Sequence, residues 1–286
     1  MNPRRLGPFE LHAAVLLFGL AGLFGKLLTL PPLVIVFARA AFAAAALGVV
    51  ARLAPRSALG IVPRGRPLVG LAAGGLLLAF HWVAFFQSIQ VSTVAIGVLS
   101  FSSFPLFTTF LEPVCFQERL RGVSIWTAAG VLLGVGLMVP AFDLHHATTL
   151  GVCWGALSGL AFAVLSLLNR RLVRTQAPLL IAGAQNLVAA LALAPLLPAL
   201  RVPLTGRELI WLAVLGIGCT ALAHTLFVRS LAQVRAHTAS VVTGLEAVYA
   251  VLFAWLLLGE APSARTLLGG AMILGTTVLA TLARDR

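Results

Sequence analysis

The chain has 286 residues, of which 60% are hydrophobic and only 10% are charged. A soluble domain usually has roughly 45–50% apolar and about 25% charged residues, so this composition excludes a soluble enzyme, a disordered tail and a coiled coil. The three cysteines do not make a disulfide framework. The net charge of +12 comes mainly from arginines that lie between apolar runs rather than on one face. This placement favours a signal for membrane topology over a nucleic-acid-binding surface.

Ten apolar runs follow one another along the chain. A helix needs about 20 mostly apolar residues to cross the hydrocarbon layer of a membrane. Proline, arginine and short polar stretches divide the sequence into runs of that size, at residues 11–30, 33–51, 67–89, 93–116, 123–139, 149–168, 179–197, 209–228, 238–258 and 266–282. The sequence therefore predicts an all-α polytopic membrane protein with no room for a soluble domain.

The distribution of arginines predicts the orientation of the chain. With ten spans, both termini lie on one side of the membrane. The loops on that side carry most of the arginines, whereas the opposite loops carry Arg201, Arg207 and Arg265. By the positive-inside rule, we expect both termini in the cytoplasm.

The two halves of the sequence resemble each other at a shift of 142 residues. The matched positions include Glu118 with Glu260, Ser88 with Ser230 and, one residue off, His81 with His224. Each half has five spans, an odd number, so the second half must be inverted. We expect residues 1–146 and 147–286 to form two inverted five-helix repeats around a central cavity. Such repeats are typical of secondary transporters that work by alternating access.

Two segments carry a resemblance to a known family. The first runs from the glycine-rich stretch ending at Lys26, through Pro31-Pro32, to the Phe-Ala-Arg motif at Arg39. The second runs from the Leu-Glu-Ala-Val motif at Glu246 to Leu-Gly-Glu at Glu260. This pattern is similar to the drug/metabolite transporter (DMT) superfamily, in its ten-helix EamA-type branch, although Ala247 stands where that family usually has proline.

The resemblance covers the whole chain and extends to the bacterial aromatic amino-acid exporters within that branch. It implies a multi-pass protein of the bacterial inner (plasma) membrane. It also implies a basket of helices around the cavity, with the first, third, fourth, sixth, eighth and ninth spans as lining and the fifth and tenth as outlying scaffold.

Polar side chains inside the spans predict the composition of the cavity, because such groups usually face a cavity or one another. We expect the substrate to be bound by His81, Trp82, Gln87, Ser100, Ser103, Trp154, Ser158, Gln185, Asn186, His224, Thr243, Glu246 and Tyr249. These neutral hydrogen-bonding groups and aromatic rings fit a zwitterion with an apolar side chain.

Charged side chains within the spans supply partners for that zwitterion. Lys26 and Arg39 are candidates to neutralise a substrate carboxylate, although both are near enough to span ends to snorkel. Glu246 lies deeper in its span and is the candidate partner for a proton or a substrate ammonium group.

The sequence thus predicts an alternating-access exporter of small amphipathic metabolites, especially aromatic and hydrophobic amino acids. A DMT transporter of other metabolites or drugs is one alternative. Another is an intramembrane serine protease of the rhomboid type, although Ser158 lacks the Gly-x-Ser-Gly arrangement. We expect no enzyme activity, metal, cofactor or nucleic-acid partner. The expected partners are a small-molecule substrate and membrane lipid, for a monomer or a homodimer.

Overall fold

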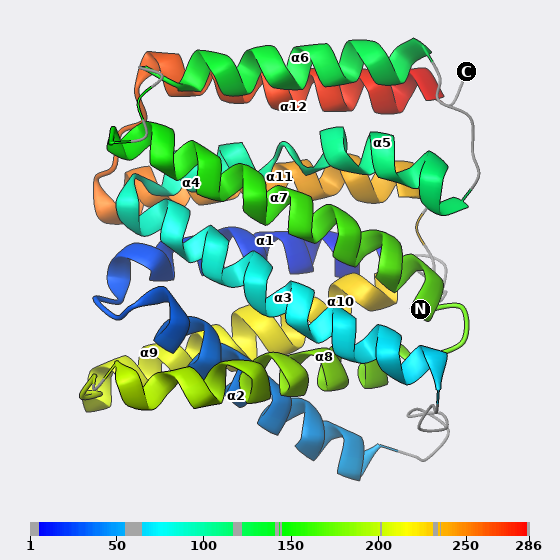
Figure 1. Cartoon of the computed structure of the whole chain (residues 1–286), viewed down its shortest axis with the longest axis vertical. Helices are drawn as coiled ribbons and strands as arrows, with labels where there is room; N and C mark the ends of the chain where they lie inside the picture. The colour runs from blue at the N-terminus through cyan, green and yellow to red at the C-terminus, as the bar shows by residue number, and fades with distance from the viewer. Residues whose placement is uncertain are drawn as a thin grey trace.

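The computed structural model describes residues 6–54, 65–116, 122–140, 143, 145–200, 202–230, 234 and 236–284. Every regular element in these residues is a helix, which confirms the all-α prediction (Figure 1). In chain order they are α1 (Leu6–Leu27), α2 (Pro32–Leu53), α3 (Arg66–Val91), α4 (Val94–Phe101), α5 (Phe104–Phe116), α6 (Gly122–Met138), α7 (Ala147–Leu172), α8 (Pro178–Leu193), the 3₁₀ helix η3 (Ala194–Ala199), α9 (Gly206–Gly216), the π-helix η4 (Ile217–Leu222), α10 (Ala223–Ser230), α11 (Ala236–Leu258) and α12 (Ala264–Arg284).

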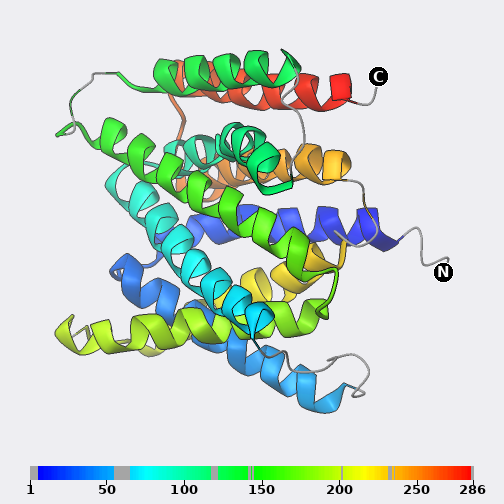
Figure 2. The ribbon, with the colours of Figure 1, turned by 45° about the vertical axis from the view of Figure 1, so that its right-hand side comes forward.

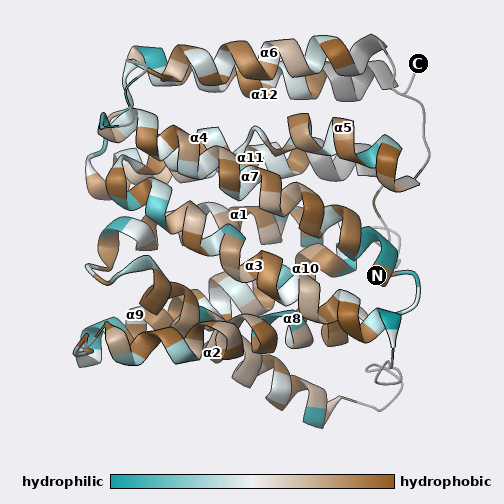
Figure 3. Ribbon diagram, in the orientation of Figure 1, coloured by the Kyte–Doolittle hydropathy of each residue, from teal (hydrophilic) through white to brown (hydrophobic). Residues whose placement is uncertain are grey.

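The helices are those of a multi-pass membrane protein. Within the described residues, seven helical segments are long and apolar enough to cross a membrane, and three shorter apolar helices fall in the remaining predicted spans. Hydrophobic residues dominate the lengths of the helices, and hydrophilic residues are most frequent near their ends (Figure 3). Large side chains such as Trp126 and Leu279 are 78% and 68% exposed, as expected for a surface covered by lipid.

The predicted fourth span is divided into α4 and α5. Proline at position 105 has no N–H to donate to a preceding carbonyl, and it disfavours helical geometry in the residue before it. The Val98 carbonyl, at the last turn of α4, accepts both the Ser102 N–H at 3.0 Å and the Ser102 hydroxyl at 2.8 Å. Helix α7 packs against this break at Gly159, where a Cβ atom would lie 2.8 Å from the Phe101 carbonyl oxygen. The break therefore lets two helices approach closely near the centre of the bundle.

The predicted eighth span is continuous but contains the π-helical turn η4 between α9 and α10. The Thr220 hydroxyl donates to the Leu215 carbonyl at 2.7 Å, five residues earlier. Helix α2 packs tightly here, since a Cβ atom at Gly216 would lie 2.5 Å from the Phe42 Cβ atom. Single π turns inside α-helices frequently mark functional sites.

The two halves pack on each other reciprocally. Each helix of the first half runs opposite to its counterpart in the second, as α2 and α8 show, and α1 begins and α12 ends at the same end of the bundle (Figures 1 and 2). Helix α3 packs on α7 as α10 packs on α1, and α1 packs on α11 as α4 and α5 pack on α7. Inverted repeats produce this pattern. The exact division after residue 146 stays a prediction, and Glu118 lies outside the described residues.

Helices α6 and α12 form a separate pair at one edge of the bundle (Figure 1). Their backbones come close at glycines: a Cβ atom at Gly134 would lie 2.7 Å from the Gly269 carbonyl oxygen. Small residues at such contacts allow dispersion forces between helices in a lipid environment. The pair is thus held mainly by its own contacts and leaves the other eight spans to enclose the centre.

Candidate functional site

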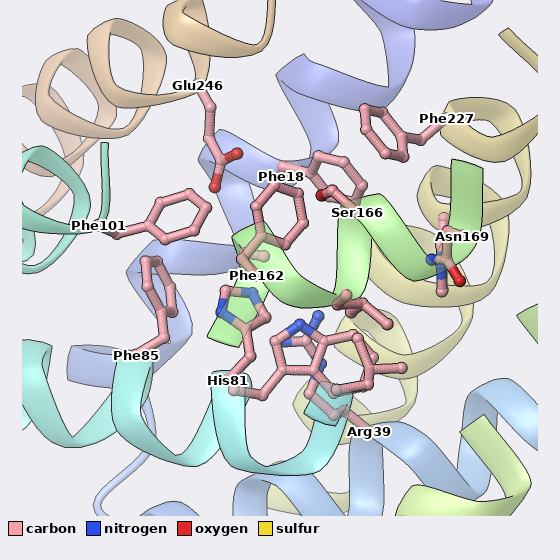
Figure 4. Close-up of a pocket in the computed structure, with 15 residues that line it drawn as sticks. Phe18, Arg39, His81, Phe85, Phe101, Phe162, Ser166, Asn169, Phe227 and Glu246 are labelled. Atoms are coloured by element: carbon pink, nitrogen blue, oxygen red, sulfur yellow. The ribbon is translucent and has the colours of Figure 1, made fainter. Parts of the chain in front are cut away.

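A cavity of about 60 Å³ lies between the two halves of the bundle (Figure 4). It has space for a few water molecules but is far smaller than the roughly 300–1,000 Å³ pockets that enclose drug-sized ligands. Aromatic rings and a small set of polar groups line it: Phe18, Ala21, Arg39, Leu78, His81, Trp82, Phe85, Phe101, Phe162, Leu165, Ser166, Asn169, His224, Phe227 and Glu246. A substrate larger than water therefore requires the helices to move apart.

Arg39 is the buried cation of this cavity. It lies about two turns from the start of α2 and is only 3% exposed. Its Nε atom donates to Thr220 Oγ1 at 3.1 Å, and its guanidinium carbon lies 3.8 Å from the centroid of the Trp82 ring, a cation–π contact. Among the described residues, neither Nη nitrogen of Arg39 has a hydrogen-bond partner. Because a guanidinium group carries five N–H donors, those on the two Nη atoms remain for a ligand.

Glu246 supplies a carboxylate to the same cavity. It comes from α11 and enters from the side opposite Arg39 in the view of Figure 4. Helix α1 packs closely here, since a Cβ atom at Gly19 would lie 3.2 Å from the Glu246 carbonyl oxygen. No residue in the described part of the chain makes a hydrogen bond or ion pair with the Glu246 carboxylate. The cavity thus holds one guanidinium group and one carboxyl group, each with unused hydrogen-bonding capacity among the described residues.

His81 is held against α7 by Ser158. Its Nδ1 atom lies 3.1 Å from the Ser158 carbonyl oxygen and 2.8 Å from Ser158 Oγ, which itself donates to the His81 carbonyl at 3.0 Å. The ring lies 5.2 Å from that of Phe101 and 5.1 Å from that of Phe162, centroid to centroid. The serine and histidine of the protease alternative do meet, but through bonds that tie both side chains to backbone carbonyls.

Amide side chains support the other polar residues of the cavity. Asn186 Nδ2 donates to the Ala182 carbonyl at 2.8 Å and lies 3.5 Å from His224 Nδ1. Gln185 Nε2 donates to Asn169 Oδ1 at 2.6 Å. Both amide residues are fully buried, so they position His224 and Asn169 from behind.

The structure distributes the predicted substrate-binding residues among three environments. Five line the cavity, namely Arg39, His81, Trp82, His224 and Glu246. Three lie behind it and hydrogen-bond to its lining, namely Ser158, Gln185 and Asn186. The rest do not line it, namely Lys26, Gln87, Ser100, Ser103, Trp154, Thr243 and Tyr249.

The sequence predicted aromatic walls for the cavity but not most of the phenylalanines that form them. Phe18, Phe85, Phe162 and Phe227 line it but were not among the predicted residues. One signal could have found two of them, because Phe85 and Phe227 are 142 residues apart and thus occupy matching positions of the internal repeat.

Polar contacts join the two halves at the end of the bundle away from the chain termini. Lys26 Nζ donates to the Ser92 carbonyl at 2.7 Å and lies 3.9 Å from Glu260 Oε1. Nearby, the Ser88 hydroxyl donates to the Gly151 carbonyl at 2.5 Å. Lys26 is thus held outside the central cavity.

Ion pairs join the same halves at the opposite end. Arg170 of α7 pairs with Glu112 of α5, and Arg229 of α10 lies 2.9 Å from Glu10 of α1. In the pseudo-symmetry of the fold, the pairing of α7 with α5 matches the pairing of α1 with the end of α11. The cavity therefore lies between two sets of contacts that each bridge the halves.

Apolar spans in two oppositely directed halves, with a cavity that carries a few buried polar groups between them, are the architecture of a secondary transporter. The chain belongs to the EamA-like transporter family, whose model matches residues 6–139 and again residues 149–282. This confirms the resemblance to the DMT superfamily.

Relatives of the chain carry transporter names. It is 30% identical to the uncharacterized transporter YwfM of Bacillus subtilis, over 77% of this chain and 75% of that protein. It is 27% identical to the pseudopaline exporter CntI of Pseudomonas aeruginosa, over 86% and 84% of the two chains. It is 25% identical to an S-adenosylmethionine uptake transporter of Rickettsia conorii, over 74% and 71%. A solved crystal structure shares the fold, with a TM-score of 0.70 over 99% of each chain at 22% identity.

Family and relatives together make the chain a membrane transporter with a small-molecule substrate rather than an enzyme. The Ser158–His81 contact is therefore a feature of a transporter's interior.

Proposed function

We propose that this transporter exports small amphipathic zwitterions, above all aromatic and other hydrophobic amino acids, across the bacterial inner membrane. Both termini face the cytoplasm, as the positive-inside rule predicts. The name of one relative, a pseudopaline exporter, supports the outward direction.

The observation that carries the proposal is the Arg39 guanidinium group, buried in the cavity with both Nη nitrogens unused among the described residues. Buried charged donors that lack acceptors are costly, so the two free Nη groups of Arg39 are best explained by an anionic ligand. A planar fork of donors suits a carboxylate. Glu246 supplies the opposite charge for an ammonium group, and the phenylalanine rings between them supply stacking area for an apolar side chain.

The position of the cavity between two sets of bridging contacts supports alternating access as the mechanism. Its volume of about 60 Å³ is too small for an amino acid, so binding requires one end to open. The reciprocal packing of the two halves makes opening at either end a similar rearrangement. Coupling to protons would use Glu246, the carboxylate of the cavity.

The proposal is tested by counterflow in proteoliposomes loaded with unlabelled L-phenylalanine. We expect the protein to exchange external radiolabelled L-phenylalanine for the internal pool. Arg39→Gln should reduce the exchange at least tenfold, because hydrogen bonds to a charged group contribute about 1.5–3 kcal/mol. Arg207→Gln is the matched control, since Arg207 is exposed and remote from the cavity, and it should exchange like the original protein.

Two results would contradict the proposal. Failure of L-phenylalanine, L-tryptophan and L-leucine to exchange would exclude the amino-acid substrate, and a thermal-shift panel of other metabolites and drugs would then identify the class. Unchanged exchange by Arg39→Gln would show that Arg39 does not bind the substrate carboxylate.

The direction of transport is tested by efflux from preloaded right-side-out vesicles. Proton coupling is tested by an imposed pH gradient, which should change the flux in the original protein but not in Glu246→Gln.

A further inference from the structure

The two cavity histidines come from matching helices of the two halves. His81 is on α3 and His224 on α10, and they are 6% and 7% exposed. Each uses its Nδ1 atom to contact a residue behind the cavity wall. No described residue hydrogen-bonds to either Nε2 atom. Neither atom is among the fully buried polar atoms that lack a hydrogen-bond partner, so both remain accessible from the cavity. Both Nε2 atoms are therefore left for whatever occupies the cavity.

The neighbours of His81 fix its tautomer. Its Nδ1 atom lies 3.1 Å from the Ser158 carbonyl oxygen, which can only accept a hydrogen bond. The Ser158 hydroxyl gives its own proton to the His81 carbonyl, so Ser158 Oγ also accepts from Nδ1, at 2.8 Å. Nδ1 must therefore carry the proton. In a neutral imidazole the other nitrogen is then an acceptor, so His81 presents a bare Nε2 to the cavity.

The neighbours of His224 fix the opposite tautomer. Asn186 Nδ2 donates to the Ala182 carbonyl at 2.8 Å, which identifies this end of the amide as its nitrogen. The same nitrogen is the atom 3.5 Å from His224 Nδ1. An amide nitrogen does not accept, so Nδ1 of His224 must be unprotonated. The proton then lies on Nε2, and His224 presents a donor to the cavity.

We infer that His81 and His224 hydrogen-bond to the two ends of the substrate. His81 accepts from its ammonium group, and His224 donates to its carboxylate. The inference rests on the zwitterion site proposed above. Two histidines that match in the repeat to within one residue thus have opposite hydrogen-bonding roles, because Ser158 accepts from Nδ1 of His81 whereas Asn186 donates to Nδ1 of His224. The pair would orient a substrate whose carboxylate also binds Arg39 and whose ammonium group also faces Glu246.

Single substitutions separate these roles when binding is measured with three probes. L-phenylalanine has both charged ends, phenethylamine has only the ammonium group, and 3-phenylpropionate has only the carboxylate. We expect His81→Asn to weaken L-phenylalanine and phenethylamine at least tenfold and to leave 3-phenylpropionate unchanged. We expect His224→Asn to weaken L-phenylalanine and 3-phenylpropionate and to leave phenethylamine unchanged.

Glutamine variants distinguish a direct role from a packing role. The Gln amide reaches the place of Nε2, whereas the Asn amide reaches only the place of Nδ1. His81→Gln and His224→Gln should therefore recover most of the binding that the asparagine variants lose. Equal losses in the Asn and Gln variants, or the same probe dependence at both positions, would overturn the inference.

A spectroscopic measurement needs no substrate, so it separates this inference from the proposed function. In protein labelled with ¹⁵N-histidine and held in nanodiscs, protonated and bare imidazole nitrogens resonate far apart. The His81 and His224 signals are assigned by their loss in the glutamine variants, with the exposed His12 as control. We expect protonated Nδ1 in His81 and protonated Nε2 in His224. The same tautomer in both residues would overturn the inference even if the protein transports L-phenylalanine. Opposite tautomers would support the donor–acceptor pair even if the protein does not transport L-phenylalanine.

Discussion

Glu260 accepts a hydrogen bond from the backbone N–H of Val94 at 2.9 Å, which ties the end of α11 to the first turn of α4. The chain reaches this position through Gly259, whose φ of +69° favours glycine. The other carboxylate oxygen of Glu260 lies 3.9 Å from Lys26 Nζ. The Leu-Gly-Glu motif thus ends α11 and presents a carboxylate to the N-terminus of α4, where negative charge is stabilising.

This arrangement predicts a graded effect of substitutions at Glu260. Glu260→Gln keeps an oxygen for the Val94 N–H and should destabilise only slightly, because a partly exposed ion pair contributes less than about 1 kcal/mol. Glu260→Ala also removes the acceptor and should cost about 1–3 kcal/mol. Melting in detergent measures both, and equal stability of the two variants would show that the hydrogen bond to Val94 contributes nothing.

Thr220 should act on substrate binding through Arg39. Thr220→Val removes the acceptor for Arg39 Nε with little change of shape, so the guanidinium group loses its fixed orientation. We expect an L-phenylalanine affinity roughly tenfold lower, in line with about 1.5–3 kcal/mol for a hydrogen bond to a charged group. Thr220→Ser keeps the hydroxyl and should bind like the original protein. A Thr220→Val protein with unchanged affinity would mean that Trp82 alone orients Arg39.

Gly216 and Gly218 provide a matched pair of tests for the packing of α2. Gly216→Ala would place a Cβ atom 2.8 Å from the Arg39 carbonyl oxygen, so α2 must shift and Arg39 with it. We expect a loss of about 1–3 kcal/mol in stability and a strong loss of counterflow. Gly218→Ala meets no atom within 4 Å, and alanine is the better helix former by about 1 kcal/mol. Gly218→Ala should therefore be neutral or stabilising. Full counterflow by Gly216→Ala would contradict the close packing of α2 at this position.

Ser158→Ala separates transport from the protease alternative. The substitution removes the hydroxyl but leaves the Ser158 carbonyl, to which His81 Nδ1 also donates. Because a neutral hydrogen bond contributes about 0.5–1.5 kcal/mol net, counterflow should fall less than tenfold. A hydrolase would instead lose its nucleophile, so the complete loss of a peptide-cleaving activity in this variant would revive the enzyme.

The sequence could predict the helices because apolar run length and proline placement act locally. Pro31 and Pro32 do mark the start of α2, and a helix falls in every predicted span. The break after Phe101 was not predicted, since serine and proline also occur within continuous membrane helices when neighbouring helices satisfy the backbone. The π turn at Thr220 was equally hidden, because it leaves no distinctive residue pattern.

The cavity was only partly predictable, for a different physical reason. Buried charges such as Arg39 and Glu246 were recognisable because a membrane tolerates them only at particular places. A phenylalanine such as Phe162 is favourable against lipid, against another helix or against a substrate. Only the rotation of each helix decides among these, and that rotation is set by tertiary packing. Lys26 is the opposite case. The sequence predicted it as a cavity residue, but its Nζ atom donates to the Ser92 carbonyl at the end of the bundle, outside the cavity.

The separate α6–α12 pair constrains the order of assembly. Helix α6 ends the first half, whereas α12 is the last described helix. During synthesis the glycine-bearing face of α6 thus has no partner until α12 is made and inserted. Closure of this pair is then a late step in biogenesis, and a chain truncated before α12 would leave α6 without the neighbour that its small residues are shaped to meet.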